Sequence, residues 1–156
     1  MIRLKILWPG KTSDPELKNL QDRYLRKINL KAKCELIETK EAKGITEKYS
    51  EKILEIEAVN LEKHIKDDFV VCLTDAGKEL RSNEFARFLD KTSARTGKII
   101  TIVVGGFLGL GNQMLSKADY LLSLSKMTYS HELCRVMLLE QIYRAISILQ
   151  RSQYAK

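Results

Sequence analysis

The sequence is poor in the residues that brace small secreted proteins or bind metals. Of its 156 residues, three are cysteine and two are histidine. The cysteines lie far apart and form no Cys-x-x-Cys pair, which argues against both a disulfide framework and a zinc site. We therefore expect Cys34, Cys72 and Cys134 to be reduced thiols, and we expect no metal.

Long apolar runs are also absent. The N-terminal stretch reaches Pro9 and Gly10 before any such run, so it lacks the apolar core of a signal peptide. Nothing approaches the roughly 18 consecutive apolar residues of a membrane span. We expect a soluble, cytoplasmic protein with no membrane partner. We also expect one domain over residues 1–156, because 44% of the residues are hydrophobic and chains of this length usually form a single core.

Acidic residues are scarce in one part of the chain. Overall, 27 basic residues stand against 20 acidic ones, which gives a charge of +7. Between Leu17 and Lys33, six residues are basic and one is acidic. This helix face is either a surface that contacts phosphates or a solvated face. The missing acidic residues favour an anionic partner, and RNA is favoured over a membrane because no basic amphipathic helix also carries an exposed apolar face.

Strand-like and helix-like patterns alternate along the chain. Asp14 and Ser82 have side chains that cap helix starts, and Asp75–Lys78 is typical of a turn. The expected strands are 2–8, 34–39, 69–74, 99–104 and 120–124; the expected helices are 15–28, 50–65, one that begins at 82, a brief segment after 111, and 131–149. This alternation predicts an α/β fold with a largely parallel sheet and a ligand site at the carboxyl ends of the central strands.

A glycine-rich loop, Gly105–Gly111, follows a β-branched strand. It lacks the third glycine of the dinucleotide fingerprint, and Asn112 and Gln113 stand where a P-loop has lysine and a hydroxyl residue. Two interpretations stay open. The loop is either a backbone wall for an uncharged base or sugar, or a simple turn.

The segment Ser123–His131 is rich in hydroxyl side chains and follows the last expected strand. His131 opens the terminal helix, where the helix dipole lowers its pKa and keeps the ring neutral. Arg135 lies one turn further along the same face. His131 is therefore either a general base or a capping or core residue.

Three stretches resemble a known family. The loop Val104–Leu110, the stretch Leu122–Thr128 and the helix His131–Ala145 are similar to the ribosomal RNA large subunit methyltransferase H family of the SPOUT superfamily. The resemblance implies a SPOUT-type parallel-sheet domain with a C-terminal trefoil knot, working as a homodimer. It also implies transfer of a methyl group from S-adenosylmethionine to N3 of a pseudouridine in 23S ribosomal RNA. Because a chain of this length presents only a modest surface, we expect recognition to use both subunits and the assembled ribosome.

The resemblance also assigns roles to individual residues. His131 and Arg135 would face the target base, and Tyr154 would act from the C-terminal tail. The expected RNA contacts are Arg23, Arg26, Lys27 and Lys156. The residues expected to hold the cofactor are Leu73, Gly105, Gly106, Gly109, Leu124, Ser125, Lys126, Met127, Thr128 and Tyr129.

The C-terminal tail departs from the family pattern. The family usually ends in Tyr-His and a basic residue that reach the partner's active site, whereas this chain ends Tyr154-Ala155-Lys156. If that histidine is the base, His131 or a water molecule must replace it here. Two alternatives follow: a non-catalytic ribosome- or RNA-binding protein that keeps the fold, or a SPOUT methyltransferase that acts on transfer RNA.

Overall fold

Five parallel strands form a single sheet in the computed structural model, which describes residues 1–155. The order across the sheet is β2-β1-β4-β3-β5. The strands are β1 (Arg3–Pro9), β2 (Lys33–Thr39), β3 (Phe69–Glu79), β4 (Ile100–Val103) and β5 (Tyr120–Ser123). The predicted α/β class with a parallel sheet is confirmed.

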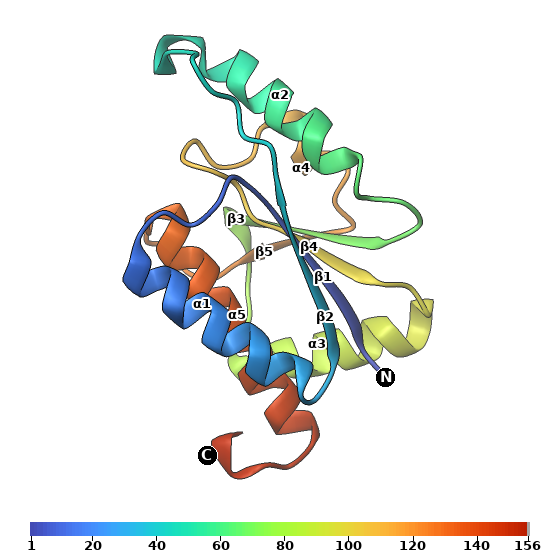
Figure 1. Ribbon diagram of the computed structural model, residues 1–156. Coiled ribbons are helices and arrows are strands. Elements are labelled where there is room, and N and C mark those ends of the chain that lie inside the picture. Colours follow the sequence, from blue (N-terminus) through green and yellow to red (C-terminus); the bar gives the residue numbers. More distant parts are fainter. Residues whose placement is uncertain (156) are drawn as a thin grey trace.

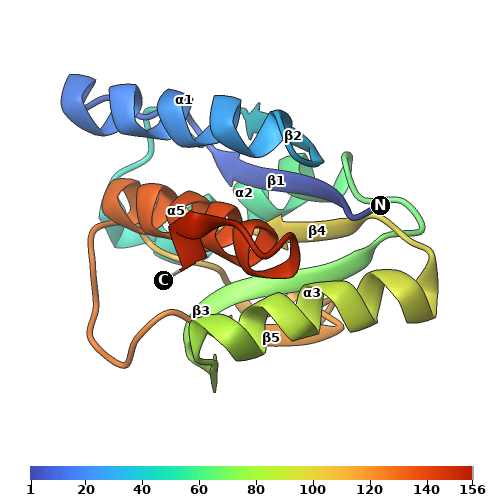
Figure 2. The same ribbon diagram turned by 90° about the horizontal axis from the view of Figure 1, so that it is seen from below.

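Helices cover both faces of this sheet (Figure 1, Figure 2). One face carries α1, α3 and α5, and the other carries α2 and the short α4. The helices are α1 (Pro15–Asn29), α2 (Ser50–Glu62), α3 (Ser82–Thr96), α4 (Asn112–Leu115) and α5 (His131–Leu149), with 3₁₀ turns η1 (Glu47–Tyr49) and η2 (Gln153–Ala155).

Side-chain alternation along β1 explains the two layers. Ile6 and Trp8 join the larger apolar cluster on the α1, α3 and α5 side. Leu7, between them, packs into the second cluster with Leu61 of α2 and Met114 of α4. Successive strand residues point to opposite faces, so the stretch Ile6–Trp8, which is covered on both sides, is apolar at every position.

Strand β3 extends further than the sequence predicts. The pattern at Asp75–Lys78 predicts a turn, but the strand continues to Glu79, with a register shift after Leu73. A β-carbon on Gly77 would lie 2.6 Å from the main-chain carbonyl carbon of Leu122, so the two strands approach closely there. Pairing of the extension with β5 replaces the predicted turn.

The expected cap of α3 is also wrong. Arg81, not Ser82, is the N-cap residue, and its main-chain N–H donates to the Glu84 carboxylate at 2.7 Å. The Ser82 hydroxyl instead donates to the Gln141 side chain of α5 at 2.7 Å. The Ser82 hydroxyl, which the local pattern assigned to the cap, is therefore used in a contact between α3 and α5.

The starts of α1 and α5 are as predicted. The Asp14 carboxylate accepts hydrogen bonds from the N–H groups of Glu16 and Leu17, at 2.9 and 3.1 Å, and Pro15 is the first helical residue. Helix α5 begins at His131 and ends at Leu149. These two helices pack against each other. They begin close together, on the side of the sheet where the strands end (Figure 1).

The cysteines are free thiols. Cys34 and Cys72 are buried, and burial raises the pKa of each thiol to about 12. Within residues 1–155, no group of three histidine, cysteine, aspartate or glutamate side chains could hold a metal ion. In the same range, no helix is long and apolar enough to cross a membrane.

Candidate active site

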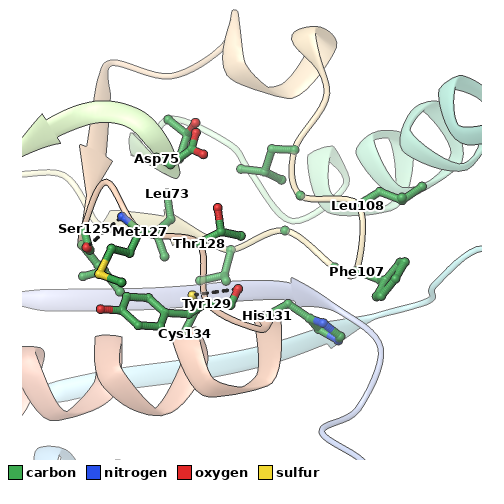
Figure 3. Close-up of a pocket in the computed structure, with 17 residues that line it drawn as sticks. Leu73, Asp75, Phe107, Leu108, Ser125, Met127, Thr128, Tyr129, His131 and Cys134 are labelled. Atoms are coloured by element: carbon green, nitrogen blue, oxygen red, sulfur yellow. Dashed lines mark hydrogen bonds between the residues drawn. The ribbon is translucent and has the colours of Figure 1, made fainter.

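A cavity of about 400 Å³ opens at the carboxyl ends of β4 and β5, beside the register shift of β3. Figure 3 shows four parts of the chain meeting around it. They are the middle of β3 (Leu73–Asp75), the glycine loop after β4, the segment after β5, and the first turn of α5. The predicted cofactor residues that line it are Leu73, Gly105, Gly106, Gly109, Leu124, Ser125, Met127, Thr128 and Tyr129. The cavity lies where an α/β sheet is expected to bind a ligand.

The glycine loop forms one wall through its main chain. Gly109 has a φ of +73° and its N–H donates to the Gly106 carbonyl at 3.0 Å, which folds the loop back on itself. A β-carbon on Gly105 would lie 2.3 Å from the Gly109 carbonyl carbon. No side chain fits at residue 105, so main-chain groups face the cavity there.

The opposite wall comes from the segment after β5. The Ser125 hydroxyl accepts a hydrogen bond from the Met127 N–H at 3.0 Å, and Ser123 donates to the Ser125 carbonyl at 2.9 Å. These bonds hold a tight loop whose Met127 side chain is 70% exposed. Phe107, across the opening, is 72% exposed. Two large apolar side chains at a cavity entrance suit a flat aromatic ligand.

His131 lines the cavity from the first turn of α5. Its ring meets the Phe107 ring edge-on, with centroids 6.3 Å apart. Burial lowers the pKa of His131, and the nearby positive charge of Arg135 lowers it further. The imidazole is therefore neutral near pH 7 and can accept a proton.

The structure corrects the expectation for Arg135. The side chain is 1% exposed and does not line the cavity. Its guanidinium donates to the Pro9 carbonyl at 2.7 Å and to the Thr12 hydroxyl at 3.0 Å, and lies over the Trp8 ring. The helical spacing placed Arg135 near His131 correctly, but the segment after β1 covers this part of α5 and takes the guanidinium.

Two other predicted residues lie away from the cavity. Lys126 is exposed and absent from the lining, although its neighbours Ser125 and Met127 are part of it. Tyr154 follows the end of α5, and the chain folds back so that its hydroxyl donates at 3.0 Å to Glu140, in the middle of α5. Glu140 lies about 14 Å along the helix from its start and does not line the cavity, so Tyr154 lies outside the cavity of its own chain.

The residues predicted to contact RNA differ in the exposure of their side chains. Arg23 and Arg26 are exposed on α1. Lys27 is half-buried, and its ammonium lies 5.7 Å from the Tyr24 ring centroid and 5.4 Å from that of Tyr143. Lys156 lies outside the described residues.

Sequence reasoning missed several residues that border the cavity: Thr74, Asp75, Val104, Phe107, Leu108, Leu110 and Cys134. Thr74 and Asp75 stand at the end of the strand predicted over 69–74, so the expectation of a ligand at the carboxyl ends of central strands could have found them. Cys134 lies three positions after His131, so helical spacing could have found it.

The fold and this site define a class of protein. A family model described as "Predicted SPOUT methyltransferase" matches residues 2–155. A solved "Probable Methyltransferase from Bordetella pertussis Tohama I" has a similar fold, with a TM-score of 0.59 and 12% identity over 93% of this chain and 96% of that chain. The chain belongs to the SPOUT methyltransferases.

Closer relatives narrow the family. "Ribosomal RNA large subunit methyltransferase H" from Clostridium botulinum (strain 657 / Type Ba4) is 40% identical over 99% of this chain and all of that protein. The protein of the same name from Thermodesulfovibrio yellowstonii is 39% identical over 99% of each chain. This chain belongs to the ribosomal RNA large subunit methyltransferase H family, as its motifs predicted.

Proposed function

We propose that this protein transfers a methyl group from S-adenosylmethionine to N3 of a pseudouridine in 23S ribosomal RNA. The observation that carries the proposal is the cavity at the carboxyl ends of β4 and β5, beside Leu73–Asp75 of β3, in a chain of this family. No lysine or arginine lines it among the described residues. It therefore suits a ligand without phosphates better than a nucleotide.

The residues present fit S-adenosylmethionine. The main chain at Gly105 leaves no room for a side chain, so a flat base can lie close to backbone donors and acceptors. Leu73 and Leu124 supply apolar contacts, and the Asp75 carboxylate at the rim can accept hydrogen bonds from ribose hydroxyls. When bound, the cofactor supplies an electrophilic methyl group.

His131 is the proposed proton acceptor. The imide N–H of the target base must lose its proton as the nitrogen becomes methylated. A neutral imidazole can take that proton, and the pKa of His131 lies below its ordinary value through burial and the Arg135 charge. The protein otherwise aligns the two reactants and excludes water.

The proposed partner surfaces follow from distance and charge. Tyr154 is held at Glu140, about 14 Å along α5 from His131 and outside the cavity lining, so we expect the tail to serve the cavity of a second copy. A hollow of about 490 Å³ between α1, α3 and α5 combines apolar walls, such as Val136 and Met137, with polar residues, and it is the proposed homodimer contact. Exposed Arg23 and Arg26 would bind RNA phosphates.

Three further elements belong to the proposal. The trefoil knot in the C-terminal part of a single domain is what the family resemblance implies. Action on assembled ribosomes is proposed because a chain of this length presents only a modest surface to RNA, and a cytoplasmic location because the proposed substrate is ribosomal RNA.

Transfer of labelled methyl from S-adenosylmethionine tests the proposal. The substrates are ribosomes that lack the modification, naked 23S RNA and transfer RNA. We expect label at one pseudouridine of 23S RNA in ribosomes. Label in transfer RNA would favour a different SPOUT substrate. No label from folded protein that still binds ribosomes would favour the non-catalytic alternative, with Ala155 in the tail as its origin.

A further inference from the structure

The first turn of α5 is tied to the segment between β1 and α1. The Glu132 carboxylate accepts three hydrogen bonds from that segment. One oxygen accepts from the N–H groups of Ser13 and Asp14, both at 2.9 Å, and the other accepts from the Ser13 hydroxyl at 2.8 Å. A carboxylate with three donors has one preferred position.

Arg135, one turn further along α5, contacts the same segment from the interior of the protein. Its two terminal nitrogens donate to the Pro9 carbonyl at 2.7 Å and the Thr12 hydroxyl at 3.0 Å. The guanidinium carbon lies 4.8 Å from the centroid of the Trp8 ring. The Thr12 hydroxyl in turn donates to Gln21 of α1 at 2.6 Å. A buried guanidinium held on this many sides has little freedom to move.

His131 is the residue that these contacts orient. It immediately precedes Glu132, and it lines the cavity together with Cys134 of the same turn. The Tyr129 main chain is joined to that turn, because its carbonyl accepts the Cys134 thiol at 3.9 Å. Movement of this turn would therefore shift both His131 and the adjoining cavity wall.

We propose that Glu132 and Arg135 are positioning residues that clamp the first turn of α5 to residues 9–14 and so fix His131 at the cavity. We call these two side chains and their partners the α5 clamp. The inference rests on the proposed function for its turnover readout. It also explains why a guanidinium beside the candidate base turns away from the cavity.

The α5 clamp predicts a specific effect on catalysis. In-line methyl transfer depends on alignment, and a misplacement of about 1 Å can cost about 100-fold in rate. Loosening the turn should lower kcat while the KM for RNA changes little, because the RNA-contacting surface stays in place. A loss of general stability would instead lower the amount of active protein without changing its pH profile.

Glu132 is the residue to vary, since Arg135 is buried and its removal would leave unpaired polar groups in the core. Glu132→Ala removes all three acceptor contacts. Glu132→Gln keeps one oxygen for the N–H groups of Ser13 and Asp14 but removes the charge. Glu55→Ala is the matched control, because Glu55 is an exposed glutamate of α2 outside the cavity.

We expect Glu132→Ala to lower kcat about 10- to 100-fold, with the KM for RNA within about twofold of wild type. Glu132→Gln should recover most of the rate, and Glu55→Ala should match wild type. A kcat for Glu132→Ala within about twofold of wild type would overturn the clamp. So would equal losses in Ala and Gln, which would assign the effect to charge alone.

Amide hydrogen exchange separates this inference from the proposed function, because it needs no substrate. Exchange at the Cys134 and Arg135 amides should be about tenfold faster in Glu132→Ala than in wild type, and near wild type in Glu132→Gln. If the wild-type protein transfers no methyl group, the proposed function fails and these exchange rates still decide the clamp. Unchanged exchange in Glu132→Ala would overturn it.

Discussion

Two residues one turn apart on α5 have opposite surroundings. His131 lies half-buried at the cavity, whereas Arg135 is 1% exposed beneath the segment after β1. Burial lowers the pKa of His131, and the positive charge of Arg135 lowers it further. The arginine thus acts on the candidate base through charge and position, without contacting the cavity.

His131→Ala should lower methyl transfer by about 100-fold or more, the usual contribution of a general base. Cofactor affinity should stay near wild type, because main-chain groups form much of the cofactor wall. Calorimetric titration with S-adenosylmethionine and single-turnover transfer measure the two effects. His64→Ala, the other histidine, is the control and should keep full activity. Equal losses of affinity and turnover in His131→Ala would assign it a structural role.

The pH dependence of turnover follows from the same residue. A protonated imidazole cannot accept a proton, so activity should fall as pH falls through the pKa of His131. That pKa lies below the ordinary value of about 6.5, so the rate should be level near neutral pH and decline only in more acidic buffer. Rate–pH profiles under single-turnover conditions measure this limb. A decline that begins above pH 7 would contradict His131 as the base.

Gly105→Ala should abolish cofactor binding. The new methyl carbon would lie 2.3 Å from the Gly109 carbonyl carbon, so the loop must move, at a cost of about 3 kcal/mol. Urea unfolding and calorimetric titration measure stability and affinity. Gly97→Ala is the control, because Gly97 has a φ of +65° and open space around it. That variant should lose some stability and keep its affinity; similar loss of affinity in both variants would contradict the prediction.

At the scale of elements, the predicted helix and strand boundaries are correct where the hydrogen-bonding partner lies close in the sequence. Asp14 and Pro15 start α1 as predicted, because the cap accepts hydrogen bonds from the next residues. Ser82 failed as a cap because Gln141, far along the chain, takes its hydroxyl. The extension of β3 past Thr74 was missed for the same reason, since its pairing partner lies in β5.

Asp14→Ala should lower the free energy of unfolding by about 1 kcal/mol through loss of the α1 cap. Its carboxylate accepts from Glu16 and Leu17, whereas its main-chain bond to Glu132 survives the substitution. Urea titration measures the change. Asp22→Ala is the control: it breaks an exposed pair with Lys18 and should cost less than about 0.5 kcal/mol. Equal costs would show that the cap contributes nothing.

At the scale of the whole molecule, the C-terminal tail folds back along α5 but stops short of the cavity. Tyr154 is held near Glu140 and Tyr143, which lie about 14 and 18 Å along α5 from His131 and do not line the cavity. We therefore propose that a site using both His131 and Tyr154 is built from two chains. The hollow between α1, α3 and α5, whose walls are part apolar and part polar, is the proposed contact.

Mixing two inactive variants tests this arrangement. His131→Ala and Tyr154→Ala homodimers should each transfer methyl poorly, while mixed dimers contain one site with both residues intact. We expect activity to return when the two proteins are unfolded and refolded together. Refolding each variant alone is the control. No recovery, with mixed dimers verified by mass spectrometry, would show that Tyr154 does not serve the partner's cavity.

Local sequence patterns are enough to define the layered α/β fold, because strand and helix periods are local. They also place the glycine loop and the segment after β5 next to strands, where a ligand is expected. Individual cofactor residues such as Gly105 and Thr128 come from the family resemblance, and both line the cavity. The resemblance to the family adds the expected reaction and cofactor.

The direction of the side chains at the site depends instead on tertiary contacts. Arg135 and Glu132 bind a segment about 120 positions earlier in the chain, and no local pattern contains that contact. A hydrogen bond to Glu140 likewise sets the position of Tyr154, which lies outside the cavity of its own chain. Burial and long-range hydrogen bonds depend on which segments meet, and that is fixed only when the whole sheet and its helices have assembled.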